Sequence, residues 1–162
     1  MGSGLENLEV LNDAQQIADE TWSLVSTWDG LARDVVGVQL ARAIDSVGAN
    51  IAEAFGRFHY ADKIRFLYYA RGSLFEAKFW IARARARGLM PPHEATDFDS
   101  RLTEVARKLN ALVRDLRFRS QTVQRSTRSI HEPVVETSYS QDPPTDDLVL
   151  DEDRGLVARP DD

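Results

Sequence analysis

The chain has 162 residues, of which 43% are hydrophobic and 28% charged, and these proportions are those of an ordinary globular domain with some additional sequence. It contains no cysteine, so disulfide bonds, thiolate metal sites and a cysteine nucleophile are excluded. The net charge of −6 is unevenly spread: residues 1–60 carry −6, residues 61–120 carry +6 and residues 121–162 carry −6, so only the middle block can attract a polyanion through its own field.

The N-terminal segment lacks the basic stretch and apolar run of a secretory signal. No part of the sequence approaches the roughly 18–20 consecutive apolar residues that a membrane span needs. We therefore expect a cytoplasmic protein that does not enter a membrane.

Two helices are predicted in the first third of the chain. The first runs from about Leu5 to Ser26, and one of its faces is marked at steps of three and four by Leu8, Leu11, Gln15, Ala18, Trp22 and Val25. The second runs from about Gly30 to Phe55, with Asp29 as its predicted N-cap. Its apolar face spans about 80° on a helical projection and comprises Leu40, Ile44, Val47, Ile51 and Phe55.

A third helix is predicted from about Ala61 to Arg87, after a connection at residues 57–60. Gly88 suits the left-handed conformation at a helix C-terminus, and the two prolines at residues 91–92 prevent continuation.

The fourth predicted helix begins at about His93 or Asp97 and ends at about Arg119. Its apolar residues alternate steps of four and three, as in a heptad seam: Phe98, Leu102, Val105, Leu109, Leu112 and Leu116. Short connections between long helices favour antiparallel neighbours. The predicted fold is therefore all-α, an antiparallel up-down four-helix bundle over residues 5–119.

From residue 120 onward the composition turns to Ser, Thr, Gln, Asp and Pro, which cannot bury enough apolar surface to offset the entropy of ordering. We predict that residues 120–162 form a disordered acidic tail. Two apolar islands interrupt it, at residues 148–150 and 156–157. Either they have no role, or they form a short motif that docks on a protein partner or on the bundle.

The third predicted helix carries apolar side chains on two faces. With Ile64 placed at 0° and about 100° added per residue, one face contains Phe66, Ala70, Ser73, Ala77, Trp80, Ile81 and Ala84, and the other contains Ile64, Tyr68, Phe75, Phe79 and Ala82. A helix in an isolated bundle needs one apolar stripe, and a second would leave a costly exposed patch on a monomer. We predict a homo-oligomer with an interface formed by Ile64, Tyr68, Phe75 and Phe79. The alternative is a central helix that its own chain covers.

Charged residues separate these two faces. Arg71, Lys78 and Arg85 form one strip at seven-residue spacing, while Arg83 and Arg87 lie near the helix end. Phosphate binding requires clustered cations, so these five residues are the candidate nucleic-acid contacts. The alternative interpretation is a solvated helix face.

A polar strip follows one side of the second predicted helix and comprises Gln39, Arg42, Ser46, Asn50, Glu53 and Arg57. The third predicted helix offers Arg65, Tyr69, Ser73 and Glu76 at matching periodicity. Because Ser and Asn disfavour a helix interior, we predict a hydrogen-bond network that locks two helices or two subunits. The alternatives are a solvated face and a contact surface for a ligand or RNA.

No catalytic or metal-binding pattern is found. The three histidines, His59, His93 and His131, form no pair at the i, i+3 or i, i+4 spacing of a helical metal site, and no phosphate-binding glycine motif occurs. We expect a non-enzymatic protein without a cofactor or metal.

Two segments carry a resemblance to a known family. Residues 39–57 read QLARAIDSVGANIAEAFGR and residues 65–76 read RFLYYARGSLFE. This pattern resembles the bacterial four-helix-bundle family of ribosomal-RNA intervening-sequence proteins, which has Asn-Ile-Ala-Glu-Gly followed by Arg, and later Arg-Phe-Leu, Gly-Ser and Glu. The chain departs from it at Val47, usually Ile, at Ala54, usually Gly, and at His59, where a usual Ser would cap the next helix.

The resemblance implies a barrel-like homopentamer of up-down bundles, mostly without a defined activity. A related group, the accessory variability determinants of diversity-generating retroelements, is similar in fold and binds nucleic acid and a reverse transcriptase through basic surfaces. Two roles follow as expectations. One is an oligomeric scaffold or adaptor whose tail docks a protein partner. The other is an RNA-binding accessory factor of a ribosomal-RNA insertion or of a reverse transcriptase.

Overall fold

The computed structural model describes residues 3–131, and the side chains of residues 9–125. The remainder of the predicted tail, including both apolar islands, lies outside this range. The described chain forms α1 (Ser3–Val25), α2 (Gly30–Ala32), the π-helical segment η1 (Arg33–Gly37), α3 (Val38–Gly56), α4 (Tyr60–Ala86) and α5 (Pro92–His131). No strand occurs among these residues, and the all-α prediction is confirmed.

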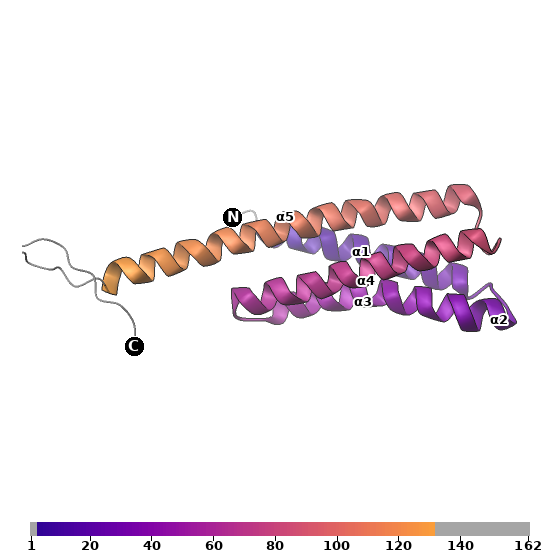
Figure 1. Cartoon of the computed structure of the whole chain (residues 1–162), viewed down its shortest axis with the longest axis horizontal. Helices are drawn as coiled ribbons and strands as arrows, with labels where there is room; N and C mark the ends of the chain where they lie inside the picture. The colour runs from indigo at the N-terminus through magenta and orange to yellow at the C-terminus, as the bar shows by residue number, and fades with distance from the viewer. Residues whose placement is uncertain (1–2, 132–162) are drawn as a thin grey trace, which may run out of the picture. The chain divides into compact units, whose positions relative to one another are not determined.

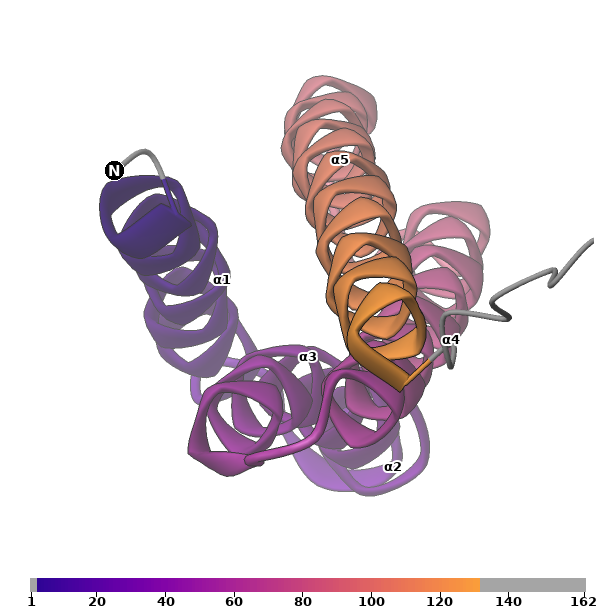
Figure 2. The same ribbon diagram turned by 90° about the vertical axis from the view of Figure 1, so that its left-hand side faces the viewer.

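Four helical rods make up the bundle, because α2, η1 and α3 follow one another without a break. Each rod lies beside the next one in the sequence: α1 beside α3, α3 beside α4 and α4 beside α5, while α1 and α5 close the bundle (Figures 1 and 2). The predicted antiparallel up-down arrangement is confirmed. As a result α1 and α4 lie diagonally across the bundle.

The core is one cluster of buried apolar side chains from all four rods. α3 and α4 form the most extensive contact in the bundle. α4 contributes large and small residues in alternation: Leu67, Ala70, Leu74, Ala77, Ile81 and Ala84. The alanines let the neighbouring backbones approach closely, and the leucines fill the remaining space. The apolar faces predicted for the second and fourth helices are confirmed, with Phe55 and Leu116 half-buried at their ends.

The end of α4 has the left-handed glycine that the sequence analysis predicted at residue 88. Gly88 has a φ of 72°. Its N–H donates to the carbonyl of Arg85 at 3.1 Å, and the N–H of Leu89 donates to the carbonyl of Ala84 at 2.9 Å. These two bonds form a Schellman motif, which requires the left-handed conformation at the glycine.

The predicted face of the first helix is only partly right: Val25 is buried and Leu11 and Ala18 pack half-buried against the core. Gln15 and Trp22 are exposed, and the residues that α1 buries are Val10, Ala14, Ile17, Thr21 and Val25. Both sets recur at steps of three and four, so periodicity did not distinguish them. The large apolar surface of Trp22 favoured a face rotated by about 100° from the buried one.

The predicted end of the last helix is wrong. α5 continues twelve residues beyond Arg119, to His131. Residues 120–131 are polar but contain neither Pro nor Gly, so nothing in them breaks a helix, and the first proline, Pro133, follows two residues after the helix ends. This last part of α5 extends beyond the end of the bundle at which α3 and α4 are joined (Figure 1).

Two helix starts lack a side-chain cap. Asp29 precedes α2 as predicted, but its side chain makes no capping hydrogen bond. His59, at the N-cap of α4, has extended backbone angles and also makes no capping bond. The orphan N–H groups at the start of α4 therefore have no side-chain acceptor at this position.

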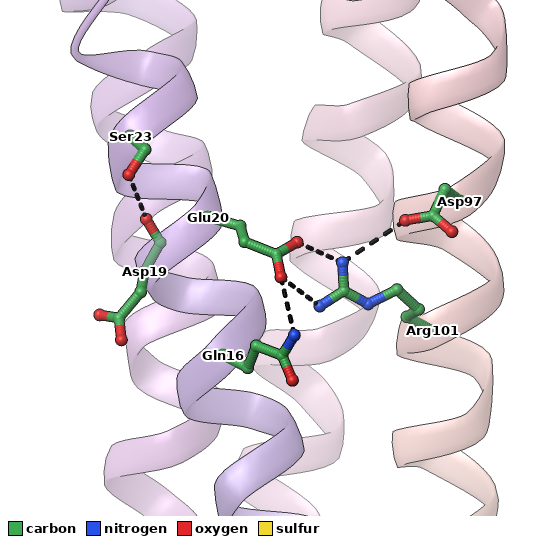
Figure 3. Close-up of polar contacts among 6 residues, drawn as sticks. All are labelled: Gln16, Asp19, Glu20, Ser23, Asp97 and Arg101. Carbon is green, nitrogen blue, oxygen red and sulfur yellow. Dashed lines mark hydrogen bonds and ion pairs between the residues drawn. The ribbon is translucent and has the colours of Figure 1, made fainter.

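Ion pairs join α1 to α5, as Figure 3 shows for Arg101, which lies between Glu20 of α1 and Asp97 of its own helix. Arg101 Nη2 donates to Glu20 Oε1 at 3.0 Å, and Gln16 donates to the same oxygen at 3.0 Å. One heptad away on both helices, Lys108 Nζ lies 2.7 Å from Asp13 Oδ2. The hydrogen bond from Arg101 lowers the pKa of Glu20, and the bond to Asp13 raises the pKa of Lys108.

Every helix of the described range is too short or too polar to cross a membrane.

Replacing His59 by Ser should stabilise the bundle. The backbone at residue 59 already has the extended conformation of an N-cap, and a Ser hydroxyl can accept from a free N–H of the first turn of α4. Relative to His59→Ala, we expect a gain of about 0.5–1 kcal/mol in the free energy of unfolding. Chemical denaturation at one fixed protein concentration measures it. Equal midpoints for the Ser and Ala variants would contradict this assignment.

Replacing Glu20 by Gln should change the pH dependence of stability. The pKa of Glu20 is lowered in the folded chain by Arg101, so the stabilisation is present above the ordinary glutamate value of about 4.3 and is lost as the pH falls through the folded-state value. At pH 7 we expect the variant to be less stable by at most about 1 kcal/mol, as for other solvent-accessible pairs. The difference should shrink as the pH falls below the ordinary glutamate value and disappear once Glu20 is protonated in the folded chain as well. Thermal unfolding across this range measures it, with Glu76→Gln, which has no ion-pair partner among residues 9–125, as the control.

Candidate functional site

A row of exposed aromatic side chains runs along α4. Tyr68 is 39% exposed, Phe75 53% and Phe79 55%. They lie within a 60° arc on the side of the helix away from its buried leucines and alanines. We call these three residues the aromatic face of α4. Residues 3–131 leave them exposed, so within the described bundle α4 is not enclosed on all sides.

Cations lie over each ring of the aromatic face. The guanidinium of Arg71 is 5.4 Å from the ring centroid of Phe75, and that of Arg83 is 5.7 Å from Phe79. Arg117 of α5 lies 5.8 Å from the ring of Tyr68 and donates to its hydroxyl at 2.7 Å. These contacts hold the rings in place and border them with positive charge.

Ile64, the fourth predicted interface residue, belongs partly to the bundle. It is half-buried and packs against the hydrophobic core. The exposed part of the predicted interface is therefore the aromatic face, and Ile64 lies at its N-terminal edge.

The five predicted nucleic-acid contacts do not form one free strip. Lys78 turns toward α5, where its ammonium lies 3.1 Å from Asp99 Oδ1 and donates to Thr103 at 2.6 Å. Arg71 is half-buried, and its Nε is buried without a hydrogen-bond partner. Arg83, Arg85 and Arg87 are exposed and form no ion pair with any residue from 9 to 125.

Arg71 and Lys78 are not free because of where the strip of Arg71, Lys78 and Arg85 lies on α4. Leu67 and Leu74, which belong to neither predicted apolar face, are fully buried beside it. The strip therefore borders the contact between α4 and α5, where Lys78 finds its partners on α5. Only the arginines near the C-terminal end of α4 remain fully available to an external anion.

The predicted polar strip of α3 is present, but its bonds are mostly internal. Asn50 donates to the backbone carbonyl of Ser46 at 2.8 Å, and Arg57 pairs with Glu53 one turn earlier. Arg57 also lies 4.5 Å from the ring centroid of Phe66, and this contact links the strip to α4.

The α4 members of the predicted network make other contacts or none. Arg65 pairs with Asp62 at 2.9 Å, and Tyr69 packs edge-on against Phe66. Arg42 and Glu76 are exposed and have no hydrogen bond or ion pair within residues 9–125. Within residues 9–125 of one chain, the predicted hydrogen-bond network between the polar residues of α3 and those of α4 therefore does not form. A network between subunits stays a prediction.

Among the exposed aromatic residues outside α4, Trp22 is the one that the sequence analysis predicted on a buried face. Trp22 of α1 is 67% exposed and lies across the bundle from the aromatic face. The neighbouring sequence does contain a signal, because Val10, Ile17 and Thr21 form an alternative stripe that places Trp22 outside. Among the described side chains, no three His, Asp or Glu residues gather closely enough to hold a metal ion.

The chain was compared with known proteins. A family model described as "23S rRNA-intervening sequence protein" matches residues 6–111. The crystal structure of a protein of unknown function from the S23 ribosomal protein family of Bacteroides thetaiotaomicron is similar with a TM-score of 0.62 and 21% sequence identity, over 67% of this chain and 98% of that one. At this identity the likeness shows the fold alone. No curated protein matches the chain.

Proposed function

Because the chain belongs to the family of 23S rRNA-intervening sequence proteins, we propose that it is a non-enzymatic scaffold or adaptor that works as a homo-oligomer. The homopentameric stoichiometry is what the family resemblance implies. Protein partners would then be held by several copies at once, which raises their effective affinity through multivalency.

The observation that carries this proposal is the aromatic face of α4. A buried aromatic side chain covers roughly 150–250 Å², and each ring of this face leaves about half of its surface to water. Covering all three would contribute roughly 5–9 kcal/mol at about 25 cal/mol per Å². Part of this is offset by the entropy lost on association. A sustained patch of this kind is more typical of an interface than of a monomer surface.

Replacing Phe79 by Glu should dissociate the oligomer. The side chain is exposed and Glu is a good helix former, so the fold should persist. Burying the new carboxylate between subunits is costly, and we expect self-association to weaken at least tenfold, about 1.4 kcal/mol. Phe75→Glu should behave in the same way.

Size-exclusion chromatography with light scattering at micromolar concentration measures this change, and circular dichroism verifies the fold. The matched control is Phe58→Glu, which alters a phenylalanine that is 92% exposed and lies outside α4; this variant should assemble like the parent chain. A parent chain that runs as a clean monomer would overturn the proposal.

A second candidate function, RNA binding, is favoured by the exposed arginines at the end of α4. Arg83, Arg85 and Arg87 lie within five residues of one another and have no carboxylate partner among the described side chains. The name of the family connects its members with an intervening sequence of 23S rRNA. In this role the protein would be an accessory factor of a ribosomal-RNA insertion or of a reverse transcriptase, as proposed from the sequence.

If RNA is bound through these arginines, affinity should fall steeply with salt. Reversing Arg85 and Arg87 to Glu should weaken binding at every salt concentration and reduce the log-log slope by about one for each lost phosphate contact. Fluorescence anisotropy with labelled single- and double-stranded RNA measures both. Arg114→Glu on α5 serves as a control for one charge reversal. Unchanged affinity in the Arg85 and Arg87 variant would remove this function; Lys78 is left intact because it holds α5.

A further inference from the structure

A groove runs along the outer side of the contact between α1 and α3. It has a volume of about 530 Å³, and most of its lining is small: Ala14 and Ala18 from α1 and Gly48, Ala49 and Ala52 from α3, with Leu11 and Gln15 as larger members. Two carboxylates, Asp19 and Asp45, line it as well. Figure 3 shows that the Asp19 carboxylate points away from the ion pairs between α1 and α5. Trp22 follows Ala18 by one turn of α1 and continues this outer surface.

No contact within the described part of the chain explains why residue 48 is a glycine. It lies in the middle of α3, where glycine is less favourable than alanine, and a Cβ built on it would meet no atom within 4 Å. The same holds for Gly72, in the middle of α4 beside the aromatic face. A mid-helix glycine without an internal neighbour is explained when another molecule approaches the backbone closely at that point.

We propose that the aromatic face of α4 in one copy docks into the groove between α1 and α3 of the next copy. This inference rests on the proposed homo-oligomer and specifies how its subunits meet. Small residues on one side and aromatic rings on the other are complementary in shape. Within one bundle α1 lies diagonally across from α4 (Figure 2), so the α1 side of the groove does not adjoin the helix that carries the aromatic face.

Charge decides between this arrangement and a two-fold contact of α4 with itself. Arg71 and Arg83 border the aromatic face, Asp19 and Asp45 border the groove, and none of the four forms an ion pair within residues 9–125. Residues 1–60, which contain the groove, carry −6, and residues 61–120, which contain the aromatic face, carry +6. Two aromatic faces packed together would oppose cation to cation, whereas the face and the groove match.

A contact between two different surfaces is heterologous. Each copy that uses its aromatic face on one neighbour still presents its groove to another, so the chain of contacts either closes into a ring or continues as a filament. Each copy with both surfaces intact can therefore bind two further copies, one at its aromatic face and one at its groove.

The test mixes two variants, each with one surface removed. Phe79→Glu disables the aromatic face, and Ala49→Arg fills the groove with an exposed, helix-compatible side chain of the wrong charge. Each variant alone should be a monomer by light scattering, with self-association weakened at least tenfold. An equimolar mixture should form a dimer of one copy of each and nothing larger, because only one intact face and one intact groove remain. If Ala49→Arg fails to fold by circular dichroism, Asp45→Arg replaces it in the same experiment.

The outcomes are distinguishable. If the parent chain is oligomeric and the groove variant assembles like it, the docking inference is overturned and the scaffold proposal stands. If both variants are monomers but their mixture does not pair, the inference is overturned as well. If the parent chain is itself monomeric, the proposed function fails and the inference fails with it.

Discussion

A helix in a four-helix bundle can bury only one arc of its surface, and α4 carries more large apolar side chains than that arc accommodates. Its leucines and alanines fill the core between α3 and α5, and its aromatic residues are left on the outside. The same helix therefore performs two tasks, one within the chain and one at its surface. Self-association, as proposed, depends on this division, because the exposed aromatic surface of α4 is the apolar area that a second copy could bury.

Much of the fold was predictable because local signals and apolar periodicity agreed. Gly88 and the prolines after it fixed the end of α4, and the heptad seam from Phe98 to Leu116 fixed the buried side of α5. Two predictions failed, wholly or in part, for different reasons. The buried face of α1 was partly misassigned because two sets of residues had the same periodicity, and the end of α5 was placed too early because polar composition was taken as the end of a helix. In α1 the stripe that contains Trp22 looked as regular as the one the core uses. Beyond Arg119 the sequence became polar, but polarity alone does not break a helix that is already formed.

The candidate site was predictable only in its apolar part. Periodicity placed Tyr68, Phe75 and Phe79 on one arc, and they are exposed on one arc. Charged residues were harder, because whether a cation is available depends on the carboxylates that other helices bring near it. Lys78 illustrates this point, since its partner Asp99 lies on a different helix and 21 residues away in the sequence. Neither the groove nor the open space around Gly48 is visible until α1 and α3 are placed side by side.

The length of α5 has a consequence for its stability along the chain. Up to about Leu116 the helix is held by the core, but the side chains of residues 121–125 are all exposed. A segment this short would be marginal as a separate peptide, and here it is helical because the preceding turns supply the nucleus. α5 is thus one continuous helix in two parts, the first packed into the bundle and the second extending beyond it with the side chains of residues 121–125 exposed.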